Sequence, residues 1–193
     1  MGESIVLPIQ APRRAALEAE GWVVVARSFG AQLDSNSINV ERLQALVAQA
    51  EGTVREITDT DVDAVLHLDA ATVEDYPGSA ATQHTALDRR AATPSASRRA
   101  FGAFVPDAEL VAMTFVDIDG ADAETQFTVV HRARRGRGLS VAVKAASVLA
   151  LTAEGVTRFR TGGSADNAAI LRANDALGYV RDEEWVTLVP NGR

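Results

Sequence analysis

The sequence predicts an α/β (α+β) fold that is organised around a turn at Arg135–Gly138, where a strand-like run changes directly into a helical one. Residues 124–130 are rich in β-branched and aromatic side chains, which is typical of a strand. Residues 139–151 contain one charge and many alanines, which predicts a largely buried helix. With 193 residues, of which 47% are hydrophobic, the chain suits one medium-sized domain with a full core.

The composition excludes several classes of function. There is no cysteine, so a disulfide, a thiolate metal site and a thioester on the chain itself are excluded. The three histidines are scattered, and we therefore expect no metal centre. A net charge of −7 argues against nucleic acid as a general partner. No run reaches the roughly 18 apolar residues of a membrane span, and the first residues do not resemble a secretion signal, so we expect a cytoplasmic protein without a membrane partner.

Residues 1–52 are predicted to form a helix–strand–helix extension to a domain that spans 53–193. Helical patterns at 12–20 and 39–49 flank a strand-like run at 22–33. This run is too apolar for a free tail, so the extension should pack on the domain or on a second copy of the chain, which leaves a homodimer open.

A short pattern is repeated at the two ends of the chain. Residues 17–23 and 175–180 both contain the end of a helix, then glycine, an aromatic residue and valine, before a strand-like run. The repeat leaves two explanations open, namely a relic of a duplicated lobe and a chance match.

From residue 53 onward the predicted order is strand, two helices, three strands, helix, strand, helix and final strands. Thr58 and Asp61 fit a capping box at the start of the first of these helices. A polar loop from Asp75 to His84 separates the first two helices. The strands are predicted near 54–57, 99–105, 109–118, 124–130, 156–160 and 179–189, and the helices from 62, near 85–92, at 139–151 and at 167–176.

The turn before the predicted helix at 139–151 has the composition of an anion site. Its glycines let a ligand approach the backbone, the first N–H groups of the helix lack partners, and the helix dipole favours negative charge. Arg135 and Arg137 add positive charge. The spacing does not fit a Walker loop, and a dinucleotide fingerprint would need glycine where Val141 stands. We therefore expect another ligand that carries phosphate.

The run Arg135-Gly-Arg-Gly138-Leu-Ser140 resembles the acyl-CoA signature of the GNAT superfamily of N-acyltransferases, with Ser140 in place of the last small residue. The block from Asn167 to Tyr179 resembles a second motif of that family, and the element order from residue 53 is similar to the GNAT order. The resemblance implies a mixed, mostly antiparallel sheet with helices on both faces.

The resemblance also implies a reaction and a set of site residues. An acetyl group would pass from acetyl-CoA, the co-substrate, directly to a primary amine of a small molecule or peptide, without a metal. The acceptor itself is not identified by the sequence. By the resemblance, the pantetheine arm lies along the main chain of Thr128, Val129 and Val130 and contacts Asn167, and its sulfur lies near Asn174. The pyrophosphate is assigned to Arg135, Gly136, Arg137, Gly138, Leu139 and Ser140, and substrate contacts are assigned to Asp75 and Tyr76, for which an ordinary loop role stays open.

The proton-transfer groups are less well defined. Many GNAT members carry, at the position of Asn174, a tyrosine that protonates the leaving thiolate. Asn174 has no suitable proton, which keeps open an alternative function as a lobe that binds acyl-CoA as a sensor or scaffold. Glu124 is the candidate base, acting through water, with a solvated strand end as its alternative. Strict alternation would place Glu124 on the same face as Thr128 and Val130, about 13 Å along the strand from Thr128.

Two other basic features have plain interpretations. Lys144 is alone on its helix and is expected to reach solvent or to pair with a carboxylate. The arginines at 132–137 also fit a nucleic-acid patch, which the negative net charge disfavours.

Overall fold

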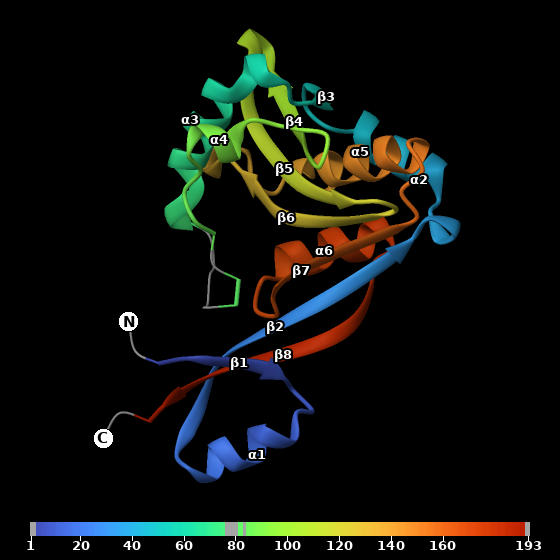
Figure 1. Cartoon of the computed structure of the whole chain (residues 1–193). Helices are drawn as coiled ribbons and strands as arrows, with labels where there is room; N and C mark the ends of the chain where they lie inside the picture. Colours follow the sequence, from blue (N-terminus) through green and yellow to red (C-terminus); the bar gives the residue numbers. More distant parts are fainter. Residues whose placement is uncertain (1–2, 76–80, 83, 192–193) are drawn as a thin grey trace.

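A computed structural model describes residues 3–75, 81–82 and 84–191 of the chain. Eight strands form one sheet in the order β1-β8-β2-β7-β6-β5-β4-β3 (Figure 1). Every neighbouring pair is antiparallel except β6 and β7, which confirms the predicted mixed, mostly antiparallel sheet. The strands are β1 (Ile5–Pro8), β2 (Trp22–Asp34), β3 (Thr53–Glu56), β4 (Arg98–Val105), β5 (Glu109–Asp119), β6 (Asp122–Val130), β7 (Arg158–Ser164) and β8 (Val180–Pro190).

Helices cover both faces of this sheet, as predicted. On one face α2, α5 and α6 share a core with β6 and β7, and on the other α3 and α4 share a core with β4, β5 and β6. None of the helices in the described part of the chain is long and apolar enough to span a membrane. The helices are α1 (Pro12–Ala19), α2 (Val40–Ala48), α3 (Val62–Thr72), α4 (Arg89–Ala92), α5 (Leu139–Ala153) and α6 (Ala168–Leu177).

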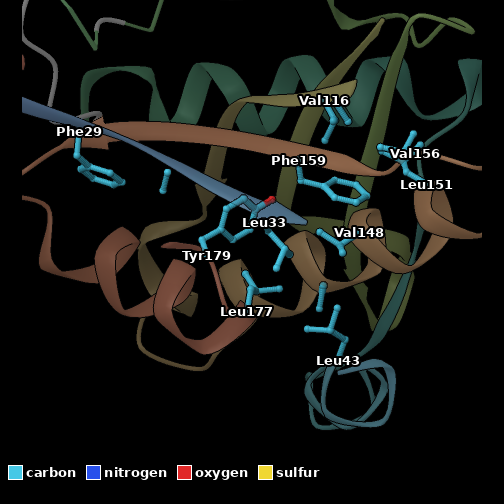
Figure 2. Packing of buried hydrophobic residues seen from close by; sticks show 13 residues of the cluster. Phe29, Leu33, Leu43, Val116, Val148, Leu151, Val156, Phe159, Leu177 and Tyr179 are labelled. Carbon is cyan, nitrogen blue, oxygen red and sulfur yellow. The ribbon is translucent and has the colours of Figure 1, made fainter. Parts of the chain in front are cut away.

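The core on the α5 side joins elements that are far apart in the sequence. Figure 2 shows Leu33 of β2, Val148 of α5, Phe159 of β7 and Leu177 of α6 in one apolar layer, with Tyr179 beside them. Each of these side chains is almost completely buried. Burial of such side chains stabilises a fold by about 1.5–3 kcal/mol each, so this layer fixes α5 and α6 against the sheet.

The N-terminal segment is part of the same sheet. Strand β2 lies between β7 and β8 and pairs with both in an antiparallel manner. Gly21 and Gly178, with φ angles of 91° and 92°, follow α1 and α6 and lead into the neighbouring strands β2 and β8. The repeated sequence pattern therefore has the same local structure twice. Whether residues 53–193 form a domain on their own stays a prediction about folding.

Some boundaries differ from the predicted ones. Strand β1 was not predicted, because its four residues give too short a pattern. Helix α4 has four residues, whereas a helix near 85–92 was expected. Strand β7 continues beyond residue 160 through Gly162 and Gly163, which pair with β2. A Cβ at Gly162 would lie 2.8 Å from the Phe29 carbonyl oxygen, so glycine permits this close approach.

Candidate functional site

A cleft opens where the two parallel strands part. Strands β6 and β7 are paired only from Asp122↔Arg158 to Glu124↔Arg160. Beyond this point β6 pairs only with β5, and β7 pairs only with β2. Within the described residues, the β7-facing edge of β6 from 125 to 130 therefore has no strand partner. A cavity of about 530 Å³ lies along this edge.

The N-terminus of α5 faces the same cavity. Gly136 and Gly138 both have a φ of 77°, which lies in the left-handed region that favours glycine. Gly138 is the N-cap of α5, and no side chain in the described part of the chain caps the helix there. Gly136, Gly138, Leu139 and Ser140 line the cavity. The helix thus presents uncapped N–H groups and its positive dipole end at the cavity, which is an arrangement suited to an anion.

The arginines of the turn are held by two carboxylates from distant segments. Asp75 binds both Arg132 and Arg135, the latter at 2.9 Å. Hydrogen bonds from Arg132 and then Arg135 lower the pKa of Asp75 below its ordinary value. Asp75 lines the cavity, and its carboxylate is thus engaged with the turn. Tyr76, the second predicted substrate contact, lies outside the described residues.

Glu51 holds the other half of this arginine cluster. Its carboxylate oxygens lie 2.6 Å from Arg134 and 2.9 Å from Arg137. The hydrogen bond from Arg137 is the main cause of a lowered pKa of Glu51. Four guanidinium groups against two carboxylates leave a net charge of +2 beside the α5 N-terminus. The turn therefore keeps a net positive charge, although the two carboxylates neutralise half of the charge of its four arginines.

Most of the residues assigned to acyl-CoA come together at the cavity. The cavity wall includes Thr128, Val129, Val130, Arg135, Gly136, Gly138, Leu139, Ser140 and Asn167. The Val130 carbonyl already accepts a hydrogen bond of 3.1 Å from Arg135 Nε. The Asn167 side chain caps α6 by accepting from the Ile170 N–H. Arg137 and Asn174 are outside the cavity wall.

Asn174 is a buried amide without a partner. Its side chain is 2% exposed, and neither Oδ1 nor Nδ2 has a hydrogen-bond partner among the described residues. A buried amide normally finds a partner, because an unsatisfied polar group costs about 1–3 kcal/mol. Because Asn174 is outside the cavity wall, this unsatisfied amide does not by itself mark the ligand site.

A β-bulge interrupts β6 in the middle of the cleft. Phe115 pairs with Phe127, but the next residue of β5, Val116, pairs with Thr125. Gln126 is therefore left without a partner, which locally bends the strand and reverses the side-chain alternation.

The bulge changes the predicted position of Glu124. Ala123 packs in the α5-side core, so its neighbour Glu124 points to the opposite face. Phe127 packs in the α3-side core, so Thr128 points to the α5 side. The prediction that Glu124 and Thr128 share a face is therefore wrong, because strict alternation does not hold across the bulge.

Glu124 instead lines a second cavity, of about 520 Å³. Arg160, Glu183 and Trp185 line it as well, and Arg160 is bound to Glu183 at 2.7 Å. Both cavities are lined by Thr125 and Gln126 of β6 and by Thr161, Gly162 and Gly163 of β7, so they meet in the gap between these strands.

Sequence reasoning missed a His–Asp pair beside the second cavity. His84 Nε2 lies 2.6 Å from Asp69 Oδ1, and the other Asp69 oxygen accepts from the Leu87 N–H at 2.8 Å. The His84 ring packs 4.3 Å from that of Phe127 and lines the second cavity. Asp69 is 2% exposed on α3, and a buried carboxylate needs a partner.

The expectation that Lys144 reaches solvent or a carboxylate is also wrong. The side chain is 1% exposed, and its Nζ donates to Thr161 Oγ1 at 2.9 Å. Burial lowers the pKa of Lys144 to about 7. The available signal was the composition of α5, since a helix that is apolar on all sides leaves no exposed face for its single charge.

Comparison with solved structures shows which known fold this chain has. No protein-family profile and no curated protein sequence matches the chain. A GCN5-related N-acetyltransferase from Sphaerobacter thermophilus matches 96% of this chain and 58% of its own length, with 14% identity and a TM-score of 0.70. A GCN5-related N-acetyltransferase from Kribbella flavida matches 98% of this chain and 68% of its own length, with 18% identity and a TM-score of 0.62. A tandem GNAT protein from the clavulanic acid biosynthesis pathway matches 96% of this chain and 62% of its own length, with 21% identity and a TM-score of 0.61.

The chain thus has the fold of the GNAT N-acetyltransferases. It spans between 58% and 68% of the length of these three structures. At such identities the likeness defines the fold, and the activity follows below as a proposal.

Proposed function

We propose that the protein is an N-acyltransferase that transfers an acetyl group from acetyl-CoA to the primary amine of a small molecule or peptide. The observation that carries the proposal is the divergence of β6 and β7 next to the uncapped N-terminus of α5. A free strand edge suits an extended chain with amide groups, and a positive helix end suits a pyrophosphate.

The residues present fit acyl-CoA as a co-substrate. The backbone of Gly136, Gly138 and Ser140 would hold the pyrophosphate, with the arginine cluster supplying positive charge. The β6 edge at Thr128 and Val129 would hold the pantetheine arm, with Asn167 on the opposite wall. The bound thioester supplies the activated acyl group. Side chains of the protein position this group and transfer the protons of the reaction.

The acceptor amine would enter through the second cavity. An alkylammonium must lose a proton before it can attack a thioester, because the protonated nitrogen has no free lone pair. Glu124 lines this cavity and is our candidate base, acting through water. Because the two cavities meet between β6 and β7, the amine and the thioester would approach from opposite sides of the sheet.

A second function is favoured by one observation. Asn174 stands where a tyrosine acid is common, and its amide offers no acidic proton. A lobe that binds acyl-CoA as a sensor or scaffold without turnover would need no such acid.

The two functions are distinguished by an assay of thiol release. Purified protein is incubated with acetyl-CoA and a panel of primary amines, and free CoA thiol is measured with a colorimetric reagent. Amine-dependent release above the rate without protein supports the transferase. Acetyl-CoA binding by calorimetry without release for any amine would support the sensor instead, and absence of binding would contradict both.

A further inference from the structure

Lys144 is the only lysine of the sequence, and it lies at the point where the two parallel strands separate. Its partner Thr161 directly follows Arg160, the last residue of β7 that is paired with β6. Both Lys144 and Thr161 line the cavity that the N-terminus of α5 faces. The ammonium group is therefore at the closed end of the cleft, whereas the α5 N-terminus is at the open end.

The surroundings of Lys144 are poor in compensating charge. Among the residues that the structure describes, its Nζ has one hydrogen-bond partner, a hydroxyl, which leaves two of the three N–H groups of an ammonium available. The Tyr179 ring lies 5.3 Å from Nζ, and burial raises the pKa of Tyr179, so this ring stays neutral near pH 7. The charged residues that share the cavity wall are Asp75, Arg134, Arg135 and Arg172, and none of them forms an ion pair with Lys144 in the described part of the chain.

The depth of the cleft matches the reach of the pantetheine arm. Val130, at the open end, is five residues from Thr125, which gives about 16 Å at roughly 3.3 Å per residue. A pantetheine arm has about the reach of five extended residues. With the pyrophosphate at the α5 N-terminus, the sulfur would therefore lie at the depth of Thr125 and Thr161, beside Lys144.

We propose that Lys144 is the general acid that protonates the departing thiolate, in the role for which Asn174 is unsuited. The inference rests on the proposed N-acyltransferase function. As the acceptor nitrogen bonds to the acyl carbon and the carbon–sulfur bond breaks, a proton passes from Nζ to the sulfur. The products are the amide, the CoA thiol and neutral Lys144. The acceptor ammonium loses two protons in all; one restores Lys144 and the other goes to solvent.

The acidity of Lys144 suits this step. Burial lowers its pKa to about 7, so a substantial fraction is protonated at neutral pH. An ordinary thiol has a pKa of about 8.5, so transfer of the proton to a thiolate is downhill. An acid with a pKa near the working pH is the efficient choice for general acid catalysis.

The single lysine permits a direct test that does not depend on turnover. Protein labelled with ¹³C-lysine gives one lysine Cε resonance, which is followed by NMR against pH with and without CoA. We expect a midpoint near pH 7 without CoA and a change of the resonance when CoA is bound. A midpoint near that of an exposed lysine, or a resonance unaffected by saturating CoA, would overturn the proposal.

Three variants test the proton transfer itself. Lys144→Met keeps the length and apolar volume of the side chain, and we expect kcat to fall about 10²-fold with unchanged acetyl-CoA affinity. If Lys144 is the acid, the wild-type rate should decline above pH 7, where Lys144 loses its proton. This decline should be absent from the Lys144→Met variant. Lys144→Arg keeps a charge but holds its proton, so it should not restore the rate. Thr152→Val is the control, because it removes an unpartnered buried hydroxyl from the same helix and should leave the rate unchanged.

The outcomes separate the inference from the function on which it rests. A folded Lys144→Met protein with the wild-type rate and pH profile would overturn the acid role alone. Full activity of Lys144→Arg would also overturn the acid role alone. So would acetylated Lys144 detected by mass spectrometry, because Lys144 would then be an acceptor of the acetyl group. Absence of thiol release from the wild type with every amine would overturn the transferase proposal, and the inference with it.

Discussion

Glu124 of β6 and Arg160 of β7 are the last pair that joins the two parallel strands of the sheet. Beyond this pair the strands separate, and helix α5, which connects them in the sequence, begins at the open end of the gap. The same geometry therefore provides a free strand edge, an uncapped helix N-terminus and a buried lysine at the closed end. The proposed acyl-CoA site depends on this divergence.

Replacing Gly138 with valine should weaken acetyl-CoA binding by more than tenfold. A Cβ at this position meets nothing within 4 Å of the protein, so its space is open to a ligand. The φ of 77° is also unfavourable for a β-branched residue, which would displace the N–H groups of the turn. Isothermal titration calorimetry measures the affinity.

Gly155→Val is the matched control for this change. Gly155 follows the other end of α5, has a φ of 97° and also has open space at its Cβ. It should lose similar stability and keep the wild-type affinity. Equal affinities of the two folded variants would contradict the assignment of the pyrophosphate to the turn.

Glu124→Gln should lower the rate at neutral pH by about 10²-fold while acetyl-CoA affinity stays the same, because the acceptor would lack its base. Raising the pH should narrow the difference from the wild type at the same pH, since more of the amine is then already neutral and needs no base. A pH series of initial rates measures both effects. A full-rate Glu124→Gln enzyme would contradict the role of Glu124, and His84, which is held by Asp69 beside the same cavity, would be the next candidate.

The turn and the helices around it follow from local sequence, whereas several features of the site do not. The glycines at 136 and 138 and the apolar run at 139–151 predict the turn and α5, because turn chemistry and helix burial are local properties. The bulge at Gln126 could not be predicted, because the residues around it have the pattern of an ordinary strand. The pairing of Asp75 with Arg132 and Arg135 joins residues about 60 positions apart, which no local pattern can predict.

The position of β2 is likewise a long-range property. Its apolar pattern predicts a strand, and the place of that strand between β7 and β8 depends on contacts across almost the whole chain. The burial of Lys144 could have been inferred in part from the sequence. Its helix was correctly predicted to be buried, and a buried helix is incompatible with the separate prediction that its lysine reaches solvent.

Deletion of residues 1–50 should yield a protein that aggregates or unfolds more readily. The deletion removes β1 and β2, so β7 loses one partner strand and β8 loses both of its partner strands. It also removes Leu33 and Leu43, which are 1% exposed in the α5-side core. Size-exclusion chromatography and thermal melting measure the effect. A monodisperse truncated protein with the full-length Tm would contradict this dependence.

Lys144 should make the stability of the protein depend on pH. Unfolded Lys144 holds its proton up to about pH 10.5, whereas the folded side chain loses it near 7. Between these values the unfolded state binds more protons, so the free energy of unfolding should rise with pH, by at most about 5 kcal/mol. Below pH 7 both states are protonated and the full cost of burying the charge remains. Denaturant titrations from pH 6 to pH 10 should show this rise in the wild type and not in Lys144→Met, and equal slopes would contradict it.

Hydrogen–deuterium exchange with and without acetyl-CoA tests the proposed site most directly, because it reports on the backbone groups that would hold the ligand. The predicted result is slower exchange in two segments, the free edge of β6 at 125–130 and the turn with the start of α5 at 136–142, while α1 and the distant ends of β2 and β8 stay unchanged. Slower exchange confined to other segments, or none at a saturating concentration, would contradict an acyl-CoA site between β6 and β7.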